Sequence, residues 1–325
     1  MKIRLSPFLQ LRFNIFLCLI FGWWLAKYYI FFLGKLYFLL NRKEKQIIED
    51  SVVDVVGKIN GGDDIQKVIN RVFQGIFSHY YEKMFIAFED KEKATKFLNE
   101  HITKNDLAVL RRSLSKGKGV IVITGHYGAI EYIPTLLAVN DFDVSMIAKF
   151  KTKQLREKVF VQAEKYAIRL IDAEKTGNVI KTAIKELREN RVLVTQCDEI
   201  EEWRPSKKKK TSFLGRVTGL DRTINIIQKR TGAEVVFGVI HRFNLREYKL
   251  IMCSYEDMKK TLNTTSLPTA GEAVLKVLEQ FIYYNPEQWY QWKKYKDLRR
   301  HSTIDVKTAK PISPQFLEHE FGKIL

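Results

Sequence analysis

Residues 120–131, with the sequence VIVITGHYGAIE, decide the fold that we predict for this chain. The first five are apolar or β-branched, which is typical of a buried strand in a parallel sheet. Gly125 and Gly128 permit a sharp turn after them, because glycine adopts backbone angles that other residues avoid. The stretch therefore predicts a strand followed by a helix, with His126 in the turn at the exit of the strand.

The rest of the chain alternates strand and helix patterns in the same way. Strands are expected over Val120–Thr124, Val144–Ala148, Ala167–Ile171, Val192–Gln196, Glu234–Ile240 and Tyr248–Cys253. Helices are expected over Ile130–Val139, Leu155–Tyr166, Val179–Asn190 and Gly271–Tyr284. Such alternation predicts an α/β fold with a mixed, largely parallel central sheet flanked by helices. The last two strands, joined through residues 244–246, are expected to form a hairpin that adds an antiparallel edge.

An apolar segment precedes this α/β region. From Phe13 to Leu40 the chain is almost entirely apolar and aromatic, with Lys27 and Lys35 among the few interruptions. A helix needs roughly 20 such residues to cross a bilayer. A cleaved signal peptide is not expected, because the stretch is too long and no small-residue cleavage site follows it. We predict an N-terminal membrane helix that either spans the bilayer or lies tilted in its interface, where lysine stems reach the headgroups.

These patterns divide the chain into three parts. We expect an N-terminal membrane anchor over residues 1–45, an α/β domain over 46–300 whose part at 46–116 is helical, and a polar tail over 301–325. Gly61-Gly62-Asp63-Asp64 is expected to break the helical part and to cap the next helix.

The composition indicates an acidic partner. Lys and Arg number 55 against 37 Asp and Glu, which gives a net charge of +18. A chain this basic tends to meet nucleic acid, an anionic bilayer or an acidic protein. The run Lys207–Lys210 is usually solvated surface, but beside an anchor it could contact anionic lipid. The three cysteines are far apart and form no C-x-x-C pair, which argues against a disulfide framework and a structural zinc site.

His126 and Glu131 are the first candidates for chemistry. On one helix, residues five apart point about 140° away from each other, so the two meet only if His126 precedes the helix. In the catalytic interpretation His126 is a general base that deprotonates a hydroxyl, and Glu131 orients its ring. A capping or core histidine is the structural alternative. The motif holds no serine or cysteine, so direct transfer fits better than a covalent enzyme intermediate.

Two further segments bear on the site. Asp198 follows the strand at 192–196 and would face the same sheet edge as His126 if both strands run parallel, although an ordinary turn or cap aspartate is the alternative. Cys197 beside it is expected to be a small buried residue rather than a nucleophile. Residues 285–294, NPEQWYQWKK, most simply form a helix start with buried tryptophans, and an aromatic and basic platform for nucleic acid is the alternative.

In this order, the pieces resemble the lipid A late acyltransferases, the lauroyl and myristoyl transferase branch of the lysophospholipid acyltransferase superfamily. The resemblance runs from the anchor to about residue 300. It depends on the H-x₄-E motif at His126, the strand-end Asp198, the segment Phe213-Leu214-Gly215 and the Pro-Glu-Gln-aromatic motif at 286–289. Where that family often has Asp-Gln, this chain has Asp198-Glu199, which puts the acceptor contacts there in doubt.

The resemblance implies a glycerolipid acyltransferase-like fold and transfer of an acyl chain from a thioester to a hydroxyl of a lipid A precursor or related glycolipid. It makes His126 and Glu131 catalytic, and it implies no metal or other cofactor. It places the protein at the bacterial inner membrane, with the catalytic domain on the cytoplasmic side. The donor would be acyl carrier protein or acyl-CoA, and an anionic bilayer surface, not nucleic acid, would be the other partner. The implied substrate-binding residues are Asp198, Phe213 and Gly215, with Lys149, Lys165 and Arg169 as candidates for a basic position.

Two other functions stay open at this point. One is acyl transfer to a different acceptor, such as a glycerophospholipid or an aminolipid. The other is a non-catalytic, basic protein of the membrane surface that binds anionic lipid or nucleic acid. The second predicts that loss of Lys207–Lys210 matters while loss of His126 does not.

Overall fold

The computed structural model describes residues 5–57, 64–150, 152–199, 211–219, 222–262 and 269–301. The run Lys207–Lys210 and the tail from residue 302 onward lie outside them. In chain order the helices are α1 (Leu5–Leu9), α2 (Arg12–Leu40), α3 (Arg42–Val56), α4 (Ile65–Phe88), α5 (Lys91–His101), α6 (Leu107–Leu114), η1 (Ile130–Tyr132), α7 (Ile133–Ala138), α8 (Lys153–Lys165), α9 (Val179–Arg188), α10 (Thr223–Thr231), α11 (Tyr255–Leu262), α12 (Ala270–Tyr284), η3 (Pro286–Gln288) and α13 (Trp292–His301). The strands are β1 (Ile102–Thr103), β2 (Val120–Thr124), β3 (Val144–Ala148), β4 (Arg169–Asp172), β5 (Val192–Gln196), β6 (Thr211–Phe213), β7 (Arg216–Thr218), β8 (Glu234–Asn244) and β9 (Glu247–Ser254).

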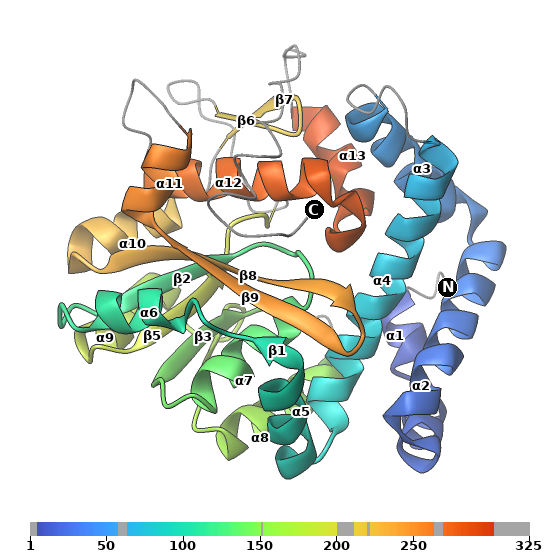
Figure 1. Cartoon of the computed structure of the whole chain (residues 1–325), viewed down its shortest axis with the longest axis horizontal. Helices are drawn as coiled ribbons and strands as arrows, with labels where there is room; N and C mark the ends of the chain where they lie inside the picture. Colours follow the sequence, from blue (N-terminus) through green and yellow to red (C-terminus); the bar gives the residue numbers. More distant parts are fainter. Residues whose placement is uncertain are drawn as a thin grey trace.

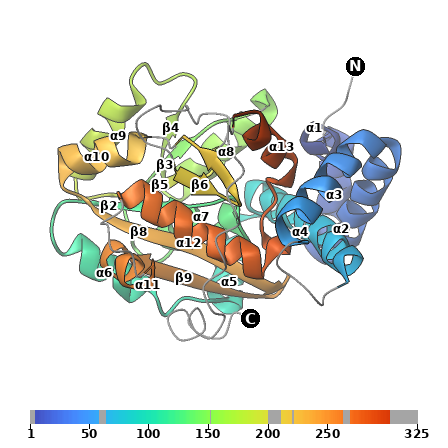
Figure 2. The same cartoon turned by 90° about the horizontal axis from the view of Figure 1, so that it is seen from above.

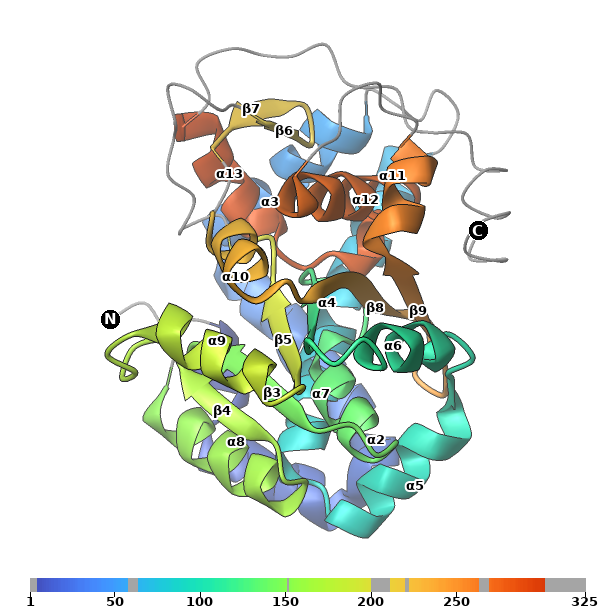
Figure 3. The same cartoon turned by 90° about the vertical axis from the view of Figure 1, so that its left-hand side faces the viewer.

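The central sheet has seven strands in the order β1-β9-β8-β2-β5-β3-β4. Only the β8–β9 pair is antiparallel among these neighbours, so the prediction of a mixed, largely parallel α/β sheet is confirmed. Helix α12 lies on one side of the sheet, and α7 and α8 lie on the other (Figures 1 and 3). Every residue of β2 is buried, as its continuous apolar run requires.

The predicted hairpin is present, but it does not form the edge of the sheet. The two-residue strand β1 pairs in parallel with β9 and covers it. A strand of two residues is too short to leave a pattern in the sequence, which is why the edge was placed one strand too early.

Helix α4 begins at the cap that the sequence predicted, and the predicted break at residues 61–63 lies outside the described residues. The Asp64 side chain accepts a hydrogen bond from the backbone N–H of Gln66 and begins α4. Helices α1 to α4 gather at one side of the molecule, beside the sheet domain (Figure 2).

Helix α2 is long and apolar enough to cross a membrane by length and composition, with a mean hydropathy of 1.8. It is broken at Gly22, whose φ is +74°. One side of α2 packs along α4, where Trp23 contacts Phe85 and Phe38 contacts Phe73. The arm before Gly22 folds back beside the arm after it, because the Tyr29 hydroxyl donates to Oδ1 of Asn14 at 2.8 Å. On the side away from α4, the second arm exposes an apolar stripe at helical spacing: Trp24, Tyr28, Phe32, Leu36 and Leu39.

Candidate active site

The turn after β2 is fixed by contacts that only glycine permits. Gly128 has φ +55°, its N–H donates to the carbonyl of Gln288 at 2.8 Å, and it bridges to Ile240 of β8. A Cβ on Gly128 would lie 1.9 Å from the Ile240 carbonyl oxygen. The chain therefore turns sharply here, and His126 stays at the carboxyl end of β2.

We expect Gly128→Ala to destabilise the fold by about 3 kcal/mol or more, because left-handed strain adds to a backbone overlap. Two variants separate these causes. Gly117 also has positive φ but nothing within 4 Å, so Gly117→Ala should cost the strain alone, and Gly177→Ala should cost neither. Melting temperatures measure the three effects. Equal losses for the Gly128 and Gly117 variants would mean that the approach to Ile240 does not constrain the turn.

The register of the sheet brings His126 to Asp198. Strands β2 and β5 are parallel neighbours, and Thr124 pairs with Gln196. Each of the two candidates lies two residues beyond its strand, so both leave the sheet at the same level and side by side. The prediction that Asp198 faces the same edge as His126 is confirmed.

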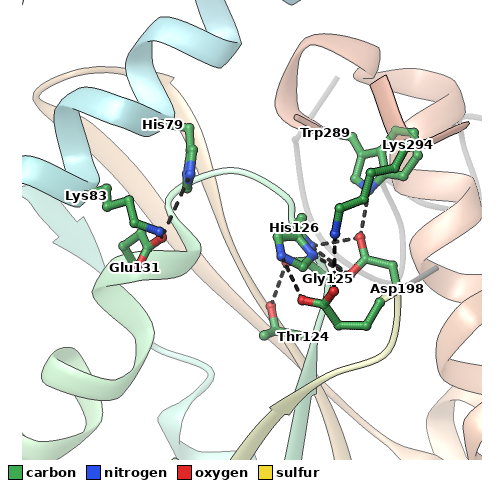
Figure 4. A network of polar contacts seen from close by, with 10 residues as sticks. His79, Lys83, Thr124, Gly125, His126, Glu131, Asp198, Trp289 and Lys294 are labelled. Atoms are coloured by element: carbon green, nitrogen blue, oxygen red, sulfur yellow. Dashed lines mark hydrogen bonds and ion pairs between the residues drawn. The ribbon is translucent and has the colours of Figure 1, made fainter. Parts of the chain in front are cut away.

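Asp198 is fully buried, and its carboxylate contacts both the ring and the backbone N–H of His126 (Figure 4). Its Oδ1 lies 2.8 Å from Nδ1 of His126. Its Oδ2 accepts from the backbone N–H of His126 at 2.9 Å and from Nε1–H of Trp289 at 2.7 Å. Three donors on one carboxylate fix both its position and the plane of the imidazole.

These contacts also set the charge of the aspartate. Burial alone would raise the pKa of Asp198, but attraction to His126 and the hydrogen bonds from His126 and Trp289 together hold that pKa below its ordinary value. Asp198 is therefore ionised at neutral pH and only accepts hydrogen bonds. Nδ1 of His126 must carry the proton, which leaves Nε2 as the basic nitrogen of the neutral ring.

Nε2 faces a second carboxylate. Oε1 of Glu199 lies 3.3 Å from it, and Oε2 of Glu199 lies 3.2 Å from Nζ of Lys294 on α13. The Glu199 side chain is 35% exposed, whereas Asp198 has no exposure, so the Nε2 side of the ring is the one that reaches the surface.

The Glu131 carboxylate, which the sequence predicted to orient His126, contacts residues of α4 instead. Its Oε1 pairs with Nζ of Lys83 on α4 at 2.8 Å and lies 3.8 Å from Nε2 of His79. The turn at Gly128 carries η1 toward α4, so the carboxylate points to that helix, and Asp198 takes the place beside His126 (Figure 4).

Glu131 is nevertheless connected to His126 through two rings. His79 stacks on Tyr290, with ring centroids 3.4 Å apart, and the Tyr290 ring meets the His126 ring edge-on at 5.1 Å. The backbone N–H of Tyr290 also donates to the carbonyl of His126. Glu131 therefore reaches the candidate base through packing rather than through a hydrogen bond.

The three candidates for a basic position lie apart from one another. Lys149 follows β3 at the same sheet edge as His126 and is exposed. Lys165 ends α8, and Arg169 begins β4 at the opposite end of its strand, where it pairs with Glu186 and Glu189. Of the three, only Lys149 shares the edge that carries the histidine.

Phe213 and Gly215 belong to the β6–β7 hairpin, and Phe213 packs against Trp289 of the candidate site. Leu214 and Gly215 both have positive φ and form the turn of the β6–β7 hairpin. Phe213, with no exposed surface, packs edge-on against Trp289 at 5.9 Å. It thus holds the indole that donates to Asp198, and it is closed to a substrate in this structure.

Sequence reasoning missed several members of the site. It predicted a buried Trp289, which is confirmed, but not its hydrogen bond to Asp198. Tyr290 and Lys294 lie in the same motif at residues 285–294, whose mixture of aromatic and basic residues was the available signal. His79 and Lys83, on α4, left no signal beyond helical spacing.

His241 on β8 adds a pH-sensitive contact beneath the turn. Its Nδ1 lies 2.9 Å from the Tyr127 hydroxyl. Burial and the positive charges of Arg242 and Lys249 lower the pKa of His241 from 6.5 to about 3. The unfolded chain thus binds one more proton than the folded chain between these pH values, and folding stability falls as the pH drops below 6.5.

We predict that His241→Gln removes part of this acid sensitivity. Glutamine stays neutral and keeps a partner for Tyr127. The slope of unfolding free energy between pH 6 and 4 should decrease by about 1.4 kcal/mol per pH unit in the variant. Denaturant unfolding at several pH values measures it, and parallel slopes in both proteins would contradict the assignment.

The open sheet with a buried histidine–aspartate pair at its carboxyl edge has the architecture in which many α/β proteins bind their ligands. A sequence profile of the bacterial lipid A biosynthesis acyltransferases matches residues 22–295, and the chain belongs to that family. It is therefore an acyltransferase of lipid A biosynthesis, and the resemblance read from the sequence is confirmed. No curated protein matches the chain. The family's place in a membrane-lipid pathway and the apolar helix α2 together indicate association with a membrane.

Proposed function

We propose that this protein moves a fatty acyl chain from a thioester to a hydroxyl of a lipid A precursor, with His126 as the general base and Asp198 as its partner. The single observation that carries the proposal is the buried contact of Asp198 with Nδ1, 2.8 Å long, which leaves Nε2 as the basic nitrogen. General-base assistance of this kind contributes about 10²–10⁴ in rate.

The reaction follows from that geometry. The acceptor hydroxyl binds beside Nε2, near the place that Glu199 Oε1 now holds at 3.3 Å. Nε2 takes the hydroxyl proton as the oxygen attacks the thioester carbonyl, and Asp198 stabilises the imidazolium that forms. When the intermediate collapses, the carbon–sulfur bond breaks and the thiolate takes the proton back from Nε2–H. The products are an ester and a free thiol, and the histidine is restored.

The other site residues receive supporting roles in this proposal. Trp289 and Phe213 hold Asp198 in place, and Glu131 acts as a positioning residue through His79 and Tyr290. Lys149 shares the sheet edge with His126 and is the basic residue that we assign to an anionic part of the donor or acceptor.

The net charge supports the choice of partners. At +18 the protein attracts acidic molecules, and acyl carrier protein and phosphorylated glycolipids are both acidic. We propose acyl carrier protein as the donor, and because acyl-CoA is also anionic, the test below compares the two donors directly. We place the protein at the bacterial inner membrane with the sheet domain on the cytoplasmic side, where acyl thioesters are made.

The test is acyl transfer by the purified full chain in mixed micelles. The donor is acyl carrier protein or coenzyme A carrying the same acyl group, and the acceptors are a lipid A precursor, a glycerophospholipid and an aminolipid. We expect mass spectrometry to find one added acyl group on the lipid A precursor, formed fastest from the carrier protein. An ester formed mainly on the glycerophospholipid, or an amide on the aminolipid, would overturn the proposed acceptor.

A further inference from the structure

A cavity of about 620 Å³ lies between helix α2, helix α4, the tip of the β8–β9 hairpin and η3. It does not include His126. Residues 287 and 288 form one of its walls, and the next residue is Trp289, the donor to Asp198. The segment that contains η3 and Trp289 therefore connects a wall of the cavity to the candidate active site. Its charged lining residues are Lys27, Arg71, Arg242, Arg246 and Glu287.

The lining carries surplus positive charge. Arg242 is neutralised by the buried Glu82, and Arg71 lies 4.0 Å from Glu287. Lys27 rests over the Tyr28 ring, and within the described part of the chain neither Lys27 nor Arg246 has a carboxylate within ion-pair distance. Two cations therefore face one cavity without carboxylate partners, which suits an anion.

The surroundings of the cavity are apolar. Trp24 and Phe243 both line it, and they are 58% and 46% exposed. Trp24 belongs to the exposed apolar stripe that runs along α2, while Phe243 comes from the hairpin tip on the opposite wall. Exposed apolar residues beside the cavity do not help to bind a small soluble anion, but they can pack against the acyl chains of an amphiphile.

The packing of α2 indicates where that stripe lies. Contacts with α4 run from Trp23 to Phe38, so this part of α2 lies along the domain rather than leaving it. The stripe is then a long apolar surface on one side of the protein, as in helices that lie in the membrane interface. Lys27, near the middle of α2, would sit at the level of the lipid headgroups.

We propose that this cavity binds the phosphate group of a lipid from the adjoining bilayer, with Lys27 and Arg246 as its ligands and the acyl chains against α2. The proposal goes beyond acyl transfer, and the lipid-binding measurement that tests it requires no turnover.

The experiment measures lipid binding to the full chain in a neutral detergent by native mass spectrometry. The probes are short-chain phosphatidic acid, phosphatidylglycerol and phosphatidylcholine. The variant is Lys27→Gln with Arg246→Gln. Its matched control is Lys229→Gln with Arg230→Gln, an exposed Lys–Arg pair at the end of α10, which does not line the cavity. Melting temperatures of both variants confirm folding.

We expect wild type and control to bind phosphatidic acid and phosphatidylglycerol more tightly than phosphatidylcholine. The cavity variant should bind the two anionic lipids about tenfold more weakly or worse, since it loses two charge-assisted contacts. Equal affinity in variant and wild type, or an equal loss in the control, would overturn the proposal. Inorganic phosphate should compete weakly, and competition as strong as that of the lipid would overturn the assignment to a lipid.

A second measurement distinguishes two sources of the phosphate. If the phosphate belongs to the acceptor, the cavity variant raises KM for a phosphorylated acceptor but not for its dephosphorylated form. If it belongs to a bulk phospholipid, the variant loses lipid binding with KM unchanged. His126→Ala should bind lipid as wild type does, so a failure of the proposed catalysis would leave this result standing.

Discussion

Acyl transfer by His126→Ala should be slower than that of the wild type by about 10²–10⁴-fold. The substitution removes Nε2, the group that we propose takes the hydroxyl proton. It also leaves Asp198 with the Trp289 donor and the backbone N–H of residue 126, so the carboxylate stays hydrogen-bonded. Release of the free thiol from acyl carrier protein, followed as an initial rate, measures the effect.

The matched control is His101→Ala. That histidine ends α5, where its Nδ1 lies 2.8 Å from the carbonyl of Arg246, and it is not in contact with the candidate site. We expect its rate to stay within about twofold of wild type, because it touches none of the proposed reacting groups. Unchanged turnover in a folded His126→Ala protein would exclude His126 as the base.

A comparison of Asp198→Asn with Glu131→Gln decides which carboxylate serves the histidine. Asp198→Asn should lower the rate by about 10²–10⁴-fold, because an amide neither stabilises an imidazolium nor fixes the tautomer that the carboxylate fixes. Glu131→Gln breaks the ion pair between Glu131 and Lys83, whose two side chains are 26% and 24% exposed. Because partly exposed ion pairs contribute little, this variant should lower the rate by about fivefold or less. Both variants keep the size of the side chain.

The reverse order of effects would contradict this assignment. It would make Glu131 the functional partner and the contact of Asp198 with His126 a structural one.

The positions of the central strands could be predicted because short runs of apolar and β-branched residues favour strands over helices. Strands β2, β3 and β5 lie at the predicted residues, since each is a short apolar run bounded by polar or glycine residues. The two-residue β1 and the break at Gly22 have no comparable signature. Gly22 is one of two glycines in the apolar segment, and nothing in the sequence distinguishes the glycine at the break from Gly34.

The pairing of His126 with Asp198 was almost visible in the sequence. Both residues lie two positions beyond the end of a predicted strand, so they would be neighbours if the two strands were adjacent and parallel. What was missing is the order of the strands, since β3 and β4 lie between β2 and β5 along the chain but not in the sheet. Glu131 was chosen instead because it is near in sequence, and Trp289 was missed as a donor because it is 91 residues from Asp198.

Helix α4 has a consequence for how an acceptor would reach the enzyme. The same helix packs against α2 on one side and carries His79 and Lys83, beside η1 and Tyr290, on the other. If α2 lies in the interface, as we propose, the ring of His126 would be held at a constant height above the lipid plane. An acceptor that keeps its tails in the membrane would then reach the ring by diffusion along the leaflet, without extraction into water.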